Sequence, residues 1–280
     1  MRGSLIPLLG AAAMTGAACA NAAPAVADQV NVTLIAEQTA LVPGERAWVG
    51  LRLEHEPHWH TYWINPGDSG LPTKLTWHLP SEIKAGDIAW PAPQRFAVGG
   101  LSNFGYGGEI VLPVPIQVDA DAKPGSNAKL ALEARWLVCR EECVPGKKRL
   151  TLTLPIATGA RANAATRKAF ASAHAAQPVA SSWSGQAILD GDQVVVALSG
   201  TDLPSAEPFD AFVVQNQLVG YAPPRFARRD GGLTLTFDKS EYLTATPATL
   251  DLVLVDGKPP NTHARSVTVP FAAANPSVKP

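Results

Sequence analysis

Two of the three cysteines in the chain lie close together in the stretch Trp136-Leu137-Val138-Cys139-Arg140-Glu141-Glu142-Cys143-Val144-Pro145-Gly146. Before the cysteines, apolar and polar residues alternate from Lys129 to Val138, which predicts a half-buried β-strand. After them, Pro145-Gly146 predicts a turn, and residues 149–154 alternate again with their leucines facing inward. The two cysteines are therefore expected at the tip of a hairpin-like connection between two core strands. There they can form a disulfide with each other and be reached by another protein.

The amino-terminal stretch, from Met1 to about Ala23, has the features of a secretory signal peptide. It has one basic residue, then a short apolar run and small residues suited to cleavage. Lipidation at Cys19 is an alternative, although Gly16 stands where a lipoprotein signal normally has leucine. No later segment is long and apolar enough to span a membrane. Export implies an oxidising compartment, in which a close cysteine pair is normally a disulfide.

Composition points to an all-β protein with two cores. The chain has 280 residues, of which 46% are hydrophobic and 17% charged, so it can bury two ordinary cores. Its 25 prolines and 23 glycines favour many short strands joined by turns over long helices. The formal net charge of -1 gives no basic surface of the kind that nucleic-acid binding requires.

Strand patterns divide the mature chain into two immunoglobulin-like β-sandwiches joined by a short helical linker. The first sandwich is expected over residues 24–157. It includes an edge segment at Ile88 to Pro93 and a glycine-rich loop from Gly99 to Gly108. A linker over 158–180 contains an alanine-rich helix from Arg161 to Ala176, which could be a rigid spacer or a hinge. A second sandwich follows over 181–274, and then a loose tail over 275–280.

One aromatic strand adds further candidate site residues. They come from the sequence His58-Trp59-His60-Thr61-Tyr62-Trp63-Ile64-Asn65-Pro66-Gly67-Asp68. His60, Trp63, Asn65 and Asp68 are candidates for partner docking or for support of the active site. The histidines and cysteines could together bind a soft metal ion, but packing inside the sandwich is the favoured interpretation. The loop after Asn65 is rich in turn-forming residues, and a simple tight loop explains it as well.

The cysteine pair has a structural interpretation and a redox interpretation. As a structural staple, a loop this short contributes only about 2 kcal/mol in the chain-entropy estimate. As a redox pair, it needs an accessible thiolate. Arg140, Lys147, Lys148 and Arg149 could lower a thiol pKa, whereas Glu141 and Glu142 oppose them. The Gly99 to Gly108 stretch lacks the G-K-S/T ending of a phosphate loop, and no G-x-S-x-G hydrolase motif is present.

Three motifs occur in an order that resembles a known family: Trp59 to Trp63 with Asn65 to Gly70, Phe104 to Pro115, and Trp136 to Pro145. Together they resemble the amino-terminal periplasmic domain of the DsbD thiol:disulfide interchange family, and most closely its ScsB-like branch. The resemblance covers roughly Gln29 to Pro155. It implies an immunoglobulin-like domain, without a cofactor, that relays electrons from a membrane-embedded partner domain to periplasmic thioredoxin-like proteins.

By this resemblance, Cys139 and Cys143 match the redox pair, and Phe104 or Tyr106 matches an aromatic cap that gates access to it. The chain departs from the family pattern in a tighter cysteine spacing and in Ser102 and Asn103, where acidic residues are expected. The membrane and thioredoxin-like portions are absent from the sequence, so an electron donor is expected to act in trans. Which cysteine attacks, and in which direction electrons flow, stays open.

The resulting prediction is a secreted periplasmic protein of thiol-disulfide exchange. The alternative is an immunoglobulin-like binding module, linked for example to copper handling, in which the disulfide is only structural. No metal, nucleic-acid or membrane-spanning site is expected in the mature chain.

Overall fold

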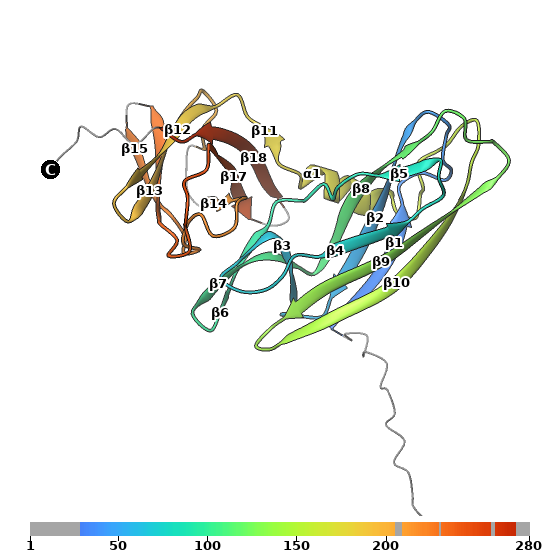
Figure 1. The fold of residues 1–280 in the computed structure, drawn as a ribbon, viewed down its shortest axis with the longest axis horizontal. Helices are drawn as coiled ribbons and strands as arrows, with labels where there is room; N and C mark the ends of the chain where they lie inside the picture. The colour runs from blue at the N-terminus through green and yellow to red at the C-terminus, as the bar shows by residue number, and fades with distance from the viewer. Residues whose placement is uncertain (1–28, 205–208, 230, 259–260, 273–280) are drawn as a thin grey trace, which may run out of the picture.

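The structure is a computed structural model that describes residues 29–204, 209–229, 231–258 and 261–272 (Figure 1). The expected signal peptide with Cys19 and the expected tail 275–280 lie outside these residues. The first part of the chain forms the strands β1 (Val30–Ala36), β2 (Arg46–His55), β3 (His60–Gly67), β4 (Lys74–His78), β5 (Ile83–Ala85), β6 (Gln94–Val98), β7 (Leu101–Gly107), β8 (Glu109–Val118), β9 (Asn127–Cys139) and β10 (Cys143–Pro155). The second part forms α1 (Arg167–Ala175), β11 (Val179–Ala180), β12 (Ser184–Asp190), β13 (Gln193–Ser199), β14 (Phe209–Val213), β15 (Arg225–Arg229), β16 (Gly232–Asp238), β17 (Thr249–Lys258) and β18 (Asn261–Pro270).

The first sandwich consists of two sheets packed face to face. One sheet has the order β1-β2-β8-β5, and the other has the order β10-β9-β3-β7-β6 with β4 paired to β9. Because alternate residues of a strand point to one face, Leu51, Leu53 and Leu112 of the first sheet pack with Leu132 and Val138 of the second. Each of these five residues is at most 2% exposed. Burial of a side chain of this size contributes roughly 1.5–3 kcal/mol.

The cysteine hairpin has the predicted position but a different turn. In the β9–β10 register, Cys143 lies opposite Cys139, and the turn consists of the residues between them. Pro145 and Gly146, predicted as the turn, lie inside β10. A proline is tolerated there because β10 is an edge strand. Glycine is required at 146 because a Cβ would lie 2.2 Å from the Trp136 ring.

The stretch predicted as a glycine-rich loop is mostly a strand. Only Gly99 and Gly100 form a turn, with φ values of 57° and 86°. The chain then continues as β7, which pairs with β6 on one side and β3 on the other. Close backbone approach explains Gly105, since a Cβ there would lie 1.8 Å from the Thr61 carbonyl oxygen. The glycines therefore serve the sheet rather than a flexible loop.

The edge segment expected at Ile88 to Pro93 is not a strand. Two prolines in this segment lack the N–H groups that a strand ladder uses. Two of its other amides bond outside the segment: Ala89 donates to the Pro113 carbonyl and Ala92 to the Ala176 carbonyl, both at 2.8 Å.

The linker helix is shorter than predicted and is fixed to the first sandwich. It spans only Arg167–Ala175. The residues before Arg167 form hydrogen bonds with the end of β1 and with the residue that follows β1, instead of forming helical turns. Thr166 Oγ1 donates to the Ala36 carbonyl at 2.6 Å, and the Asn163 amide donates to the Glu37 carbonyl at 2.7 Å. Phe170 is fully buried and packs with Val111 of β8. These contacts favour a rigid connection over a free hinge.

The second sandwich has its own core. Its sheets have the orders β11-β18-β17-β14 and β12-β13-β16-β15. Val196 and Leu235 from one sheet pack with Leu252 from the other, and each is at most 1% exposed. The sequence patterns missed β15, an edge strand whose only large apolar residue is Phe226. The predicted all-β fold, with two immunoglobulin-like sandwiches and a short helix between them, is confirmed.

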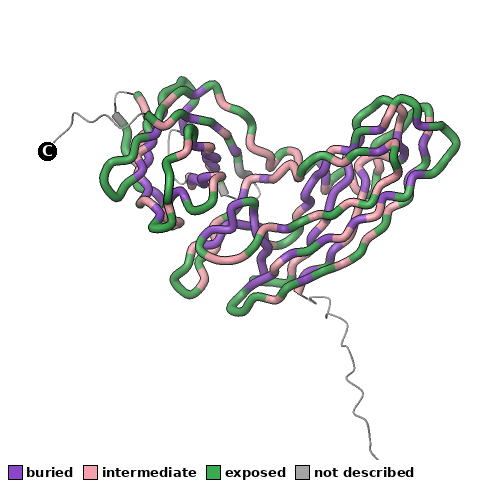
Figure 2. Tube along the Cα trace, viewed as in Figure 1, coloured by how far each residue is buried: buried purple, intermediate pink, exposed green. Residues whose placement is uncertain are grey.

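The two sandwiches contact each other through β3, β6 and β7, which lie next to the second sandwich (Figure 1). Phe104 of β7 and Trp63 of β3 pack against Phe212 of β14, with ring centroids 5.0 and 6.2 Å apart. Figure 2 shows buried residues along both sandwiches and along the strands between them. The second sandwich therefore completes the apolar core on this side of the first.

Candidate functional site

The candidate site is the disulfide at the tip of the β9–β10 hairpin. Cys139 and Cys143 are joined by a disulfide with their Cα atoms 4.2 Å apart. The two residues differ sharply in exposure: Cys139 is 2% exposed, whereas Cys143 lies in the exposed class. An incoming protein therefore meets Cys143 first.

A row of paired residues places His60 beside the disulfide. His60 of β3 lies opposite Cys139 of β9, which lies opposite Cys143 of β10. Directly opposite residues of antiparallel strands point to the same face, with Cβ atoms about 5 Å apart. His60 and the disulfide thus share the outer face of the sheet. On the other side, His60 pairs with Gly107 of β7.

Two aromatic rings complete this face. The Phe96 ring stacks on the His60 ring with centroids 4.5 Å apart and planes 9° apart. The Tyr62 ring meets His60 edge-on at 5.3 Å, and Tyr62 Oη lies 3.6 Å from Cys143 Sγ. Burial raises the pKa of Tyr62 above its usual value of 10.0, so its hydroxyl keeps its proton at neutral pH. We call His60, Tyr62 and Phe96 the aromatic face.

Sequence reasoning did not single out Tyr62 or Phe96. Tyr62 could have been found from the period of two that places it on the same side of its strand as His60. Phe96 could not, because its strand was not predicted.

The predicted cap residues lie on the opposite side of the sheet. Phe104 and Tyr106 are 3% exposed, and both belong to the core between the two sandwiches. Tyr106 Oη donates a hydrogen bond to the Pro91 carbonyl at 2.7 Å. On β7, Gly105 and Gly107 lie opposite Tyr62 and His60, so they are on the side of the sheet that carries the disulfide. Phe104 and Tyr106 alternate with these glycines and therefore point to the other side, away from the disulfide. The structure therefore contradicts the expectation that Phe104 or Tyr106 covers the cysteines, and the rings that lie beside the disulfide are those of the aromatic face.

The other three predicted site residues have structural contacts: two of them contact the second sandwich, and one bonds within the first. Trp63 packs on Phe212. Asn65 is fully buried and donates to the Val213 carbonyl at 2.8 Å. Asp68 is exposed and accepts a hydrogen bond from the Ser102 amide at 2.7 Å. Only His60 of the four lies beside the cysteine pair.

The cations near the cysteines in sequence have other partners. Lys147 and Arg149 form ion pairs with Glu133 at 3.1 and 3.4 Å. The amine of Lys148 donates to the Val32 carbonyl at 2.8 Å. Arg140 lies over the Trp59 ring, 5.5 Å from its centroid. These contacts hold the hairpin and its base, and none of them is a contact with a cysteine sulfur.

Burial makes His60 a pH-sensitive part of the fold. Desolvation, with a smaller effect of nearby His55, lowers the pKa of His60 from 6.5 to about 4. Its Nε2 atom has no hydrogen-bond partner within the described residues. The unfolded chain therefore binds a proton at higher pH than the folded chain. The stability that neutral His60 provides is complete above pH 6.5 and is lost as the pH falls toward 4.

We expect the free energy of unfolding to decrease between pH 6.5 and 4 by on the order of 2 kcal/mol through His60, after solvent screening. Urea denaturation at several pH values measures this decrease. The His60→Gln variant should show a smaller decrease. His58→Gln, which changes an exposed histidine, serves as the control and should behave as the unmodified protein. Equal pH dependence of all three proteins would contradict the assignment.

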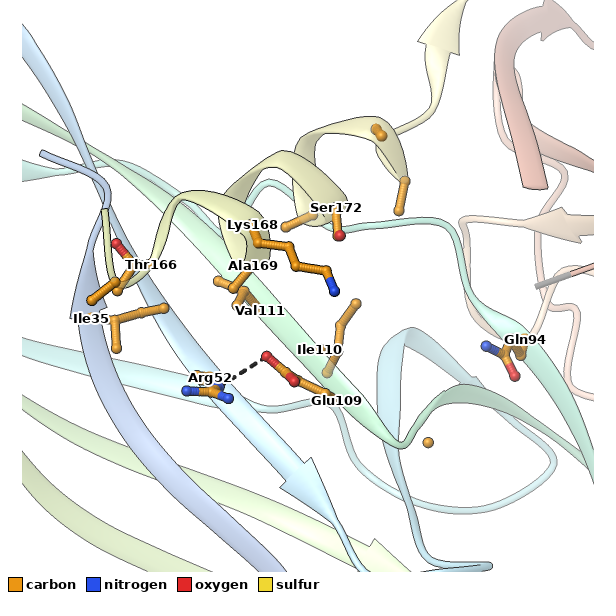
Figure 3. A pocket seen from close by; sticks show the side chains of 15 residues that line it. Ile35, Arg52, Gln94, Glu109, Ile110, Val111, Thr166, Lys168, Ala169 and Ser172 are labelled. Carbon is orange, nitrogen blue, oxygen red and sulfur yellow. Dashed lines mark ion pairs between the residues drawn. The ribbon is translucent and has the colours of Figure 1, made fainter. Parts of the chain in front are cut away.

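The described residues contain no group of three or more His, Cys, Asp or Glu side chains arranged to hold a metal ion. Within the same residues, no helix is long and apolar enough to cross a membrane. A cleft of about 690 Å³ lies between α1 and β8 (Figure 3). Figure 3 shows Arg52 and Glu109 paired in it, at 3.0 Å, with Lys168 nearby. Neither cysteine lines this cleft, so the site at the disulfide is a separate surface.

These features define a class: a protein of two immunoglobulin-like sandwiches with a disulfide whose second cysteine is accessible. Residues 31–155 match the family model of the thiol:disulfide interchange protein DsbD, N-terminal. The match covers nearly all of the first sandwich, which is therefore similar to the N-terminal domain of DsbD, and it supports a thiol-disulfide interchange domain.

The chain is similar to several solved structures, and one of them shares the fold of both sandwiches. The N-terminal periplasmic domain of ScsB from Proteus mirabilis is similar with a TM-score of 0.62 at 20% identity, over 87% of this chain and 94% of that chain. A variant of BcpA, the major pilin subunit of Bacillus cereus, matches with a TM-score of 0.28 at 8% identity, over 88% of this chain and 68% of that chain. The D00-D0 domain of intimin matches with a TM-score of 0.22 at 11% identity, over 87% of this chain and 100% of that chain. No curated protein sequence matches the chain.

Proposed function

We propose that this protein works in the periplasm and passes electrons from a donor to thioredoxin-like proteins through the Cys139/Cys143 pair. The observation that supports this proposal best is the unequal exposure of the two cysteines. A structural staple needs neither sulfur to be accessible, whereas exchange needs one sulfur that a partner can reach. The DsbD family match and the shared fold with the ScsB domain support the same chemistry.

In the proposed cycle, the Cys143 thiolate of the reduced pair attacks one sulfur of a partner disulfide. A mixed disulfide forms as the partner's own bond breaks, and the released partner sulfur takes up a proton. The Cys139 thiolate then attacks Cys143, which re-forms the Cys139–Cys143 disulfide and releases the partner as a dithiol. Two electrons have passed to the partner. A donor dithiol, acting in trans from the membrane, restores the reduced pair by the reverse steps.

The reduction potential of the pair tests this function. Purified mature protein is equilibrated in dithiothreitol or glutathione buffers of graded potential, and free thiols are counted. A working exchange pair is expected above about -300 mV, whereas a structural disulfide lies below that value. The Cys139→Ser/Cys143→Ser variant is the blank for the thiol count. A potential below this limit would favour the binding-module alternative.

A further inference from the structure

We propose that Arg95 is a positioning residue through which the second sandwich keeps Cys139 covered, so that only Cys143 is open to reagents from outside. This inference rests on the proposed exchange function and gives the second sandwich a part in it. One short strand, β6, links the two: its Arg95 side chain contacts the second sandwich, and its Phe96 side chain belongs to the aromatic face.

Arg95 anchors β6 to the second sandwich. Its Nε and Nη2 atoms donate to the two carboxylate oxygens of Asp210, each at 2.8 Å. Its Nη1 atom donates to the Tyr221 carbonyl. The guanidinium also lies over the rings of Phe104 and Phe212, 4.7 and 5.2 Å from their centroids. The Arg95 side chain is 13% exposed and that of Asp210 is 30% exposed, so this bidentate ion pair is partly shielded from water. Bidentate pairs of arginine with a carboxylate are among the stronger polar contacts in proteins.

Phe96, the next residue, points to the opposite side of the strand. There it stacks on His60, and His60 lies opposite Cys139. The chain of contacts from the second sandwich to the buried cysteine is therefore Asp210, Arg95, Phe96, His60 and Cys139. Each step is an ion pair, a peptide bond, a ring contact or a strand pairing.

The strand β6 has little else to hold it. It is the last strand of its sheet and pairs only with β7. Its hairpin ends in the Gly99-Gly100 turn, around which a Cβ would meet nothing within 4 Å. Edge strands with few buried contacts open at low free-energy cost. Without the contacts of Arg95, Phe96 is therefore expected to move away from His60, which would make the Cys139 sulfur more accessible to reagents.

The experiment uses the full mature chain in its reduced form and iodoacetamide as the probe. A thiolate sulfur displaces iodide and gains a stable carbon bond, so each cysteine can be followed by mass spectrometry. Trypsin cleaves after Arg140 and so separates the Cys139 peptide from the Cys143 peptide. We expect Arg95→Gln and Asp210→Asn each to raise the alkylation rate of Cys139 by about tenfold, the weight of a charge-assisted hydrogen bond. The rate of exposed Cys143 should stay the same, which provides an internal control.

Two further variants separate positioning from general loss of stability. Leu235→Ala removes a fully buried side chain from the second core without touching Arg95, and should leave both rates unchanged under native conditions. In a Phe96→Ala background, which is itself expected to open Cys139, Arg95→Gln should add nothing. Arg95→Lys keeps the charge but loses the fork, and should behave like Arg95→Gln.

The proposal is overturned if Arg95→Gln leaves the Cys139 rate unchanged, if Leu235→Ala raises it as much, or if the full effect of Arg95→Gln persists without Phe96. Because alkylation needs no partner protein, this test succeeds or fails independently of the reduction potential that tests the exchange function.

Discussion

Cys139→Ser is expected to accumulate a lasting mixed disulfide through Cys143, whereas Cys143→Ser is not. In the first variant the exposed thiol can still attack a protein disulfide, but the residue that would resolve the product is gone. In the second, the remaining thiol is buried at 2% exposure beside His60. Without resolution inside the same molecule, turnover should fall on the order of a thousandfold in both variants.

A suitable model partner is a thioredoxin variant that keeps only its exposed active-site cysteine, activated as a disulfide with a small aromatic thiol, because it has no second thiol to reverse the trapped bond. Each reduced variant is mixed with it, the reaction is quenched with acid, and the covalent complex is quantified on a non-reducing gel and identified by mass spectrometry. The double-serine variant provides the background. Equal trapping by both single variants would contradict the assignment of Cys143 as the attacking residue, and no trapping by either would argue against exchange with thioredoxin-like proteins.

Phe104→Ala is expected to destabilise the protein by about 3–5 kcal/mol, the usual cost of removing a buried phenylalanine ring. The Phe104 ring contacts Phe212 and Tyr221 at 5.0 and 5.7 Å, and Arg95 lies over it. Its loss leaves a cavity between the two sandwiches. Urea denaturation followed by tryptophan fluorescence measures the change.

The control for this prediction is Phe226→Ala. Phe226 is a half-buried ring on the edge strand β15, so its removal should cost less than half as much. Similar losses in the two variants would contradict the buried interdomain position of Phe104. The result also decides how an altered cysteine reactivity in Phe104→Ala is interpreted, because it would come from a loosened interface and not from a removed cap.

The sequence was sufficient for features that depend on neighbouring residues. Alternation of apolar and polar side chains predicts β9 and β10, and the spacing of Cys139 and Cys143 predicts their disulfide. Both are short-range properties, since strand period and loop length are visible in a single window. His60 is a candidate for the same reason, because it belongs to a visible aromatic strand, and the structure places it opposite Cys139.

The errors concern contacts between distant residues. The resemblance predicts Phe104 or Tyr106 as a cap over the cysteines, but the glycines beside Phe104 fit close strand pairing and its ring packs against Phe212, 108 residues later. Gly146 suggested a turn, whereas the Trp136 ring across the hairpin explains it. The partnership of Arg95 with Asp210 is equally long-range. No local pattern encodes which sandwich covers which strand.

The shared core has a consequence for where this chain can be divided. The matched family segment ends at residue 155. A fragment ending there would lose Phe170, which packs on Val111, and Phe212, which packs on Trp63 and Phe104. Bare aromatic surface on both sides of the fragment would favour self-association. A fragment that keeps the first sandwich covered must therefore include residues beyond 155, where the family match ends.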